Sequence, residues 1–251
     1  GNANLILVNP AGILFGNHAS LNVPAAFTAT TATGVEFGGR SPQWSATGNN
    51  NYAAMVGMPT GFTFAGNATG TIVNAGNLAV PSGQSLMLLG GSVVNVGTLS
   101  ASGGQVTIAA VPGNNRVRLS HVGSLLSLEF QPVAAPSSLP SLSPQTLPQL
   151  LTGGIASHAT GLTVNSQGQV ELTGAGIRIP SGAGSVTSAG RIDVSALALG
   201  QVGGGVQLLG DRVALVGTAQ ISASGSAGGG TVLLGGDFQG QGSAPTASST
   251  F

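Results

Sequence analysis

The chain alternates between short apolar runs and short polar or glycine-rich breaks along most of its length. Each run holds three to five residues rich in Val, Ile and Leu, and a Gly, an Asn or a Ser-Gly pair ends it. Runs of this length bounded by turn formers are typical of β-strands, and no extended i, i+3, i+4 apolar pattern occurs. The sequence therefore predicts an all-β protein, with strands at residues 5–8, 13–15, 71–74, 78–80, 85–89, 93–96, 106–108, 162–164, 170–172, 177–179, 191–194 and 206–209.

The break between the first two runs reads Asn9-Pro10-Ala11-Gly12. Proline presets φ for the second position of a tight turn, glycine accepts φ > 0, and an Asn side chain can bond its own turn backbone. We therefore expect the chain to run straight up to residue 8, to corner sharply, and to run straight again from Ile13.

Two distant segments match each other in four blocks that keep one order. Residues 88–90 match 208–210, 93–98 match 213–218, 99–103 match 221–225, and 104–108 match 230–234. The later copy adds residues only at Gly-, Ser- and Ala-rich breaks. Internal similarity of this kind is typical of solenoids and propellers.

Turn type and strand length separate these two architectures. Propeller blades use antiparallel hairpins, and the Asn-Gly and Asp-Gly dipeptides that favour hairpin turns are absent from the sequence. A coil of about 20 residues, with two or three short strands and glycine-rich corners, fits better. This pattern predicts a parallel β-helix of about ten coils that stack about 4.8 Å apart.

Two stretches interrupt the pattern. Residues 38–61 hold the only Trp, the only Tyr and two of the three Met, and we interpret them as a hairpin excursion packed on the flank of the coil. Residues 132–148 carry a Pro at every fourth position, and a Pro cannot donate to a strand ladder. We therefore expect a β-helix over residues 1–131 with an insertion at about 38–61, a Pro-rich loop or linker over 132–157, and continuing β-helix coils over 158–251.

Charge and hydropathy narrow the classes of partner. Charged residues make up 5% of the chain against a usual level of roughly 25%, and the net charge is zero. Such a chain has no basic surface for nucleic acid or for anionic lipid. No run approaches the ~18 apolar residues of a spanning helix, so we do not expect the chain to span a membrane.

Candidate catalytic chemistry is sparse. The acidic residues are Glu36, Glu129, Glu171, Asp193, Asp211 and Asp237. No two are adjacent, so we expect isolated solvated charges, although the last three could align across coils. His18, His121 and His158 lack the spacing of metal ligands, and there is no Cys. We therefore expect no catalytic residue, no metal and no cofactor.

An alternative is a β-helix that binds or cleaves a polysaccharide. Cleavage of this kind uses paired carboxylates, and binding uses aromatic side chains beside polar groups. Only residues 36–52 offer both kinds of side chain, in Glu36, Arg40, Trp44 and Tyr52. Trp44 and Tyr52 are therefore the candidate glycan-binding residues.

Residues 1–27 resemble the core of the secretion domain of filamentous-haemagglutinin-type exoproteins, the two-partner secretion family, as found in large exoproteins of cyanobacteria and related Gram-negative bacteria. The family motif Asn-Pro-Asn-Gly-Ile is matched by Asn9-Pro10-Ala11-Gly12-Ile13, with Ala11 in place of the second Asn. The segments 2–5, 15–16 and 230–245 also fit the family pattern.

The resemblance implies a right-handed parallel β-helix at the cell surface or in the medium, as part of a large adhesin. It also implies export through an outer-membrane β-barrel transporter with periplasmic domains. Asn9, Pro10, Gly12 and Ile13 would then form the secretion motif, either by shaping the corner or by contacting the transporter. The family domain begins further upstream, so we expect this chain to be a fragment that lacks the start of the domain.

Overall fold

The computed structural model describes residues 3–38, 44–66, 70–122, 125–132, 161–164, 170–173, 177–178, 183–235 and 249–250. Their regular structure is β-strand apart from one short 3-10 turn, η1 (Tyr52–Ala54), which confirms the all-β prediction. No helix in this described part of the chain has the length and apolar character that crossing a membrane requires.

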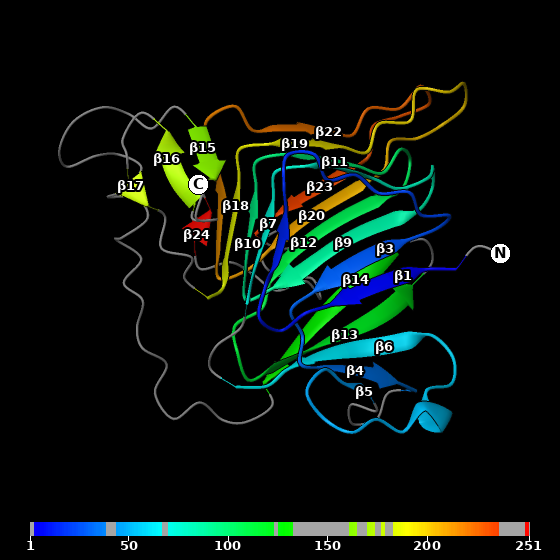
Figure 1. Cartoon of the computed structure of the whole chain (residues 1–251). Helices are drawn as coiled ribbons and strands as arrows, with labels where there is room; N and C mark the ends of the chain where they lie inside the picture. The colour runs from blue at the N-terminus through cyan, green and yellow to red at the C-terminus, as the bar shows by residue number, and fades with distance from the viewer. Residues whose placement is uncertain are drawn as a thin grey trace.

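Three parallel sheets form the body of the molecule (Figure 1). Sheet A contains, in spatial order, β1 (Leu5–Val8), β3 (Phe27–Thr30), β9 (Ser85–Gly90), β12 (Gln105–Ala110), β20 (Gly205–Leu209) and β23 (Thr231–Leu234). Sheet B contains β2 (Ile13–Phe15), β7 (Thr71–Asn74), β10 (Ser92–Asn95), β18 (Ser185–Ser188), β21 (Arg212–Leu215) and β24 (Ser249–Thr250). Sheet C contains β8 (Asn77–Ala79), β11 (Thr98–Ser100), β19 (Arg191–Asp193) and β22 (Gln220–Ser222). The chain visits the three sheets in turn and advances by one strand each time, so the fold is a parallel β-helix, as predicted.

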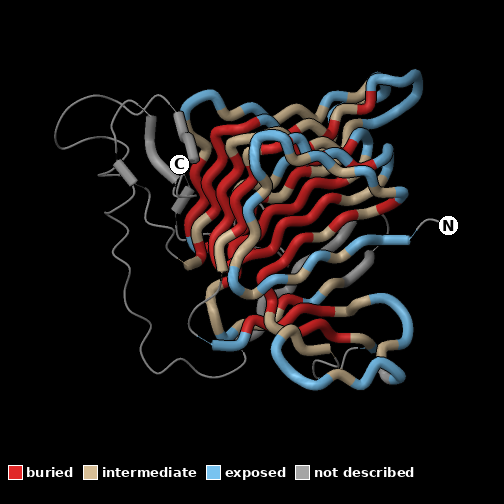
Figure 2. Tube along the Cα trace, in the orientation of Figure 1, coloured by how far each residue is buried: buried red, intermediate tan, exposed pale blue. Residues whose placement is uncertain are grey.

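Within the coils, equivalent residues stack in columns that fill the interior. One column of sheet A holds Leu88, Ile108 and Leu208, and each of these side chains is fully buried. The four sequence blocks that match each other occupy the same columns two coils apart: Leu88 with Leu208 in sheet A, and Val93 with Val213 in sheet B. Buried residues follow the stacked strands of the three sheets (Figure 2), and most residues of the interior core are aliphatic.

The described residues form six coils, since sheets A and B have six strands each, rather than the predicted ten. Two excursions account for the difference. The first leaves the coil after β3 and returns at β7, and the second leaves after β12 and returns at β18. Both excursions lengthen the chain without adding a coil to the β-helix.

The excursions build a fourth, antiparallel sheet, which we call sheet D, on the outer face of sheet A. It contains β4 (Gly34–Phe37), β5 (Trp44–Ser45), β6 (Pro59–Phe64), β13 (Asn115–Val122) and β14 (Leu125–Pro132). Phe62, Phe64 and Val117 of sheet D pack on Met87 and Leu89 of sheet A. Residues 38–61 contribute β5 and the start of β6, which pair with β4 on its two sides rather than with each other, so this excursion belongs to a larger sheet that covers a second apolar core instead of forming a hairpin of its own.

The parallel coils resume at β18, later than the predicted start at residue 158. The strands β15 (Gly161–Val164), β16 (Val170–Thr173) and β17 (Ile177–Arg178) pair antiparallel instead. Their connections are short, and short connections favour hairpins, whereas parallel neighbours need a long crossover. Residues 133–160, which include most of the Pro-rich stretch, lie outside the described residues, so the boundaries of that segment stay predictions.

Candidate functional site at the first coil

The corner predicted at Asn9 connects β1 to β2. The side-chain Oδ1 of Asn9 accepts a hydrogen bond from the Ala11 N–H at 3.1 Å, and the Asn9 carbonyl accepts one from the Gly12 N–H, also at 3.1 Å. Gly12 has φ +124°, a conformation that L side chains rarely adopt. The residue types of the motif therefore match the geometry of the turn.

Residues of the second coil contact the backbone of this turn. The Asn9 N–H donates to the Thr30 carbonyl at 3.0 Å. A Cβ atom at Gly70 would lie 2.5 Å from the Pro10 carbonyl oxygen and 2.5 Å from the Gly12 nitrogen. Sequence reasoning missed Gly70, because this glycine lies far from the motif along the chain and nothing in its local sequence distinguishes it.

Ile13 is the part of the motif that faces inward. It pairs with Ile72 of the second coil and packs against the interior core. Asn9, in contrast, is exposed, and Pro10 is half-buried. The motif thus divides into an outward-facing turn and an inward-facing anchor.

Three leucines on β1 and β2, the strands that flank the turn, are exposed. Leu5 and Leu7 occupy columns whose next members, Phe27 and Ala29, are buried, yet they are 48% and 41% exposed. Leu14 is 55% exposed. In the described part of the chain, β1 and β2 stand at the outer ends of sheets A and B, with a strand neighbour on one side only.

The structure does not assemble the residues considered for polysaccharide chemistry into one surface. Glu36 is 1% exposed, which overturns the expectation of a solvated charge. Its Oε1 lies 2.6 Å from Nε of Arg116 and accepts a hydrogen bond from Thr63 Oγ1 at 2.8 Å. Trp44 packs partly buried against the outer core, while Tyr52 on η1 is 72% exposed. Arg40 lies outside the described residues.

Asp193 and Asp211 do not align across coils either. Asp193 lies on sheet C, whereas Asp211 directly precedes β21 of sheet B and covers the backbone of Gly184. Asp237 falls outside the described residues. The hydrogen bond from Arg191 lowers the pKa of the Asp193 carboxyl, while burial raises the pKa of Asp211. No group of three His, Cys, Asp or Glu side chains in the described ranges could hold a metal ion.

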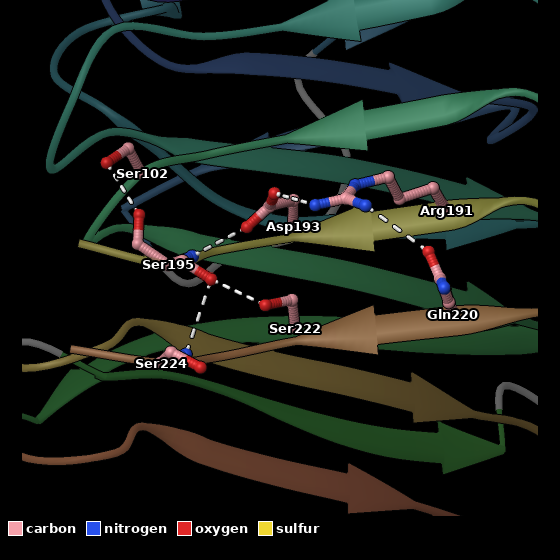
Figure 3. A network of polar contacts seen from close by, with 7 residues as sticks. All are labelled: Ser102, Arg191, Asp193, Ser195, Gln220, Ser222 and Ser224. Atoms are coloured by element: carbon pink, nitrogen blue, oxygen red, sulfur yellow. Dashed lines mark hydrogen bonds and ion pairs between the residues drawn. The ribbon is translucent and has the colours of Figure 1, made fainter. Parts of the chain in front are cut away.

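The sequence did not predict a polar network that lies on the outer face of sheet C (Figure 3). Nη2 of Arg191 lies 2.7 Å from Oδ2 of Asp193, and Nη1 donates to Gln220 Oε1 of the next coil at 3.2 Å. The Ser195 and Ser222 hydroxyls lie 2.7 Å apart. These contacts join side chains of consecutive coils. The Arg-x-Asp spacing within one strand is the only signal that could have pointed to them.

Comparisons with known proteins point to one family. A family model described as the TPS secretion domain matches residues 1–172, a span that includes the motif turn and Gly70. Among solved structures, the chain is similar to the HMW1 secretion domain from Haemophilus influenzae, with 21% identity and a TM-score of 0.42. That similarity covers 98% of this chain and 61% of the HMW1 chain. No curated protein sequence matches.

Proposed function

The chain belongs to the family of two-partner secretion (TPS) secretion domains, and from this premise we propose that its first coil is the element recognised by the transporter. TPS domains engage an outer-membrane transporter. The protein is therefore exported across the outer membrane of a Gram-negative bacterium, to the cell surface or into the medium. Secretion domains of this family serve export and are not catalytic.

The observation that carries the proposal is the exposed, rigid turn at Asn9. The hydrogen bonds of the turn and the close approach of Gly70 fix its shape. Binding to a partner would therefore cost the turn little conformational entropy. We assign recognition to Asn9, Pro10 and Gly12, and anchoring of the turn to Ile13.

We further propose that export is driven by folding from the N-terminus. In sheets A and B the spatial order of the strands equals their order along the chain. Each coil that emerges can therefore pair with the coil that folded before it. Ladder bonds and buried aliphatic side chains then oppose backward movement without any nucleotide. A chain with 5% charged residues and no Cys suits passage in an extended form.

The same geometry supports a role as a scaffold in a large surface-exposed or released adhesin. A parallel β-helix can extend by adding coils at its end, so further coils can carry a receptor-binding region away from the cell. The outer-membrane transporter would be of the β-barrel type with periplasmic domains.

The test separates turn shape from turn recognition. Asn9→Ala removes one exposed hydrogen bond, worth about 1 kcal/mol, and leaves the backbone corner in place. Gly70→Ala pushes a methyl group into the turn from the second coil without changing the motif. Gly16→Ala is the matched control, because a Cβ atom there meets nothing within 4 Å. Each variant is expressed together with the cognate transporter. The amount exported and the melting temperature of the protein are then measured.

We expect Gly70→Ala to lose export together with stability, and Gly16→Ala to keep both. Asn9→Ala should keep a melting temperature close to that of the parent and still lose export. Parental export of Asn9→Ala would contradict recognition of the turn.

A further inference from the structure

One side of the solenoid, where sheet C passes into sheet A, carries no charged residue. The connections on this side are residues 21–26, 80–84, 101–104, 194–204 and 223–230. They consist of Gly, Ala, Ser, Pro, Asn, Gln, Val and Leu only. The charged residues in the described ranges lie instead on strands of sheets B, C and D, on β16 and β17, or directly before a strand.

The connection between β19 and β20 projects furthest from this side (Figures 1 and 2, upper right). Its tip is apolar. Leu197 is 74% exposed, Leu199 is 98% exposed, and Val202 is 55% exposed. Single exposed hydrophobic residues are common on protein surfaces, but three within six residues of one uncharged loop form a patch.

The loop is held in this conformation by the connection of the next coil. Ala196 and Val202 form parallel bridges with Gly225 and Gly228. The Ser226 hydroxyl donates to the Ala198 carbonyl at 2.5 Å, and the Ala227 N–H donates to the Gln201 carbonyl at 2.8 Å. A hydrogen-bonded backbone frame therefore holds the loop in the conformation that exposes the two leucines.

A second apolar tip projects from the same side, at the lower right of Figures 1 and 2. It follows β5 and contains η1. Tyr52 is 72% exposed, Val56 is 76% exposed and Met58 is 59% exposed. Residues 44–59 contain no charged side chain.

We propose that this uncharged side docks on the surface of a lipid bilayer, with Leu197, Leu199 and Val202 inserted among the acyl chains and Tyr52, Val56 and Met58 as a second contact. A stable protein interface buries roughly 800 Å² and about 20–30 residues per partner, whereas each tip offers three exposed apolar side chains. A bilayer accepts protruding apolar side chains without shape complementarity. Backbone groups already paired within the loop lose little on entering the interface. Because no charge is involved, an uncharged bilayer suffices and added salt leaves docking unchanged.

The experiment measures co-flotation of the 251-residue chain with phosphatidylcholine vesicles, at low salt and at high salt. We expect binding in both conditions. Leu199→Ser should reduce the bound fraction at least fivefold, and Leu197→Ser/Leu199→Ser should abolish it. Val56→Ser/Met58→Ser should weaken binding by a smaller factor. The matched control is Leu14→Ser, which removes a leucine of 55% exposure from the first coil and should leave binding unchanged.

A second measurement tests insertion directly. In the Leu199→Trp variant, the added indole fluorescence should be quenched by vesicles whose acyl chains carry bromine, compared with the parent chain that has Trp44 alone. Absence of flotation would overturn the proposal. Flotation that Leu14→Ser and Leu199→Ser reduce equally, or that requires anionic lipid, would also overturn it, since the two tips would then not be the contact.

Discussion

Asn74 donates a hydrogen bond from its Nδ2 to Oδ1 of Asn95, one coil further along, at 2.9 Å. Both side chains are fully buried, and Asn95 in turn donates to the Ser188 hydroxyl at 3.2 Å. The three residues occupy one column of sheet B. They therefore pin the lateral register of three successive coils.

Replacing Asn95 should be costly for this reason. Asn95→Ala leaves the Asn74 amide and the Ser188 hydroxyl without their mutual partner inside the column, which should lower the free energy of unfolding by about 1–3 kcal/mol. Urea denaturation measures the change. Asn77→Ala, at an exposed position of sheet C, is the matched control and should stay within about 0.5 kcal/mol of the parent. Equal effects of the two variants would mean that the buried column does not stabilise the stack.

The Glu36–Arg116 ion pair links the first excursion to the second within sheet D. Its loss should therefore weaken the pairing of the two excursions. Arg116→Met leaves the buried carboxylate without its ion-pair partner and should destabilise the chain by about 3 kcal/mol. Glu36→Gln keeps a polar partner for Thr63 and should cost less. Arg191→Met is the control, since it breaks an ion pair of similar length, 2.7 Å, in which the Arg side chain is 50% exposed. That variant should cost no more than about 1 kcal/mol.

The two aspartates with shifted pKa values should respond to acid with opposite signs. The hydrogen bond from Arg191 lowers the pKa of Asp193 below 3.8, so its stabilising effect is present above pH ~4 and is lost as pH falls through the lowered pKa. Burial raises the pKa of Asp211, so the ionised carboxylate lowers the stability of the folded protein at neutral pH. This destabilisation decreases as the pH falls and the carboxylate becomes protonated. Asp193→Asn should therefore lower stability at pH 7 and flatten its decline below pH 4, while Asp211→Asn should raise stability at pH 7. Melting temperatures between pH 2 and pH 7 test both signs, and equal signs at pH 7 would contradict the assignment.

Folding-driven export makes the position of a broken coil matter. Leu88 and Leu208 share one buried column, two coils apart, so Leu88→Pro and Leu208→Pro impose the same local defect early and late in the stack. We expect both to reduce export, and Leu88→Pro to reduce it more, because fewer coils can form ahead of the break. The measurement is the amount of each variant in the culture medium. Parental export of Leu208→Pro would argue against folding as the driving force.

The strands and the Asn9 corner could be predicted because their signals are local. A short aliphatic run between turn formers specifies a strand wherever it occurs, and the residues of the corner contain both of its hydrogen-bonding partners. Register between coils could also be predicted where two coils kept similar residues, as Leu88 and Leu208 did.

Long-range pairing could not be predicted in the same way. Glu36 and Arg116 are isolated charges in the sequence, and only the meeting of the two excursions turns them into a buried pair. The number of coils was overestimated for the same reason, since nothing local distinguishes a strand of sheet D or of the β15–β17 sheet from a strand of the coil. The support of the motif turn by Gly70 depends on how coils stack, which the motif itself does not encode.

The most direct test of the central claim is the amount of the chain in the culture medium, with and without the cognate transporter, for the parent, Asn9→Ala and Gly12→Val. We expect export of the parent to require the transporter, and both variants to stay inside the cell. Release without the transporter, or release of both variants at the parental level, would contradict the claim that the first coil directs two-partner secretion. Binding to a panel of polysaccharides would then become the next function to examine.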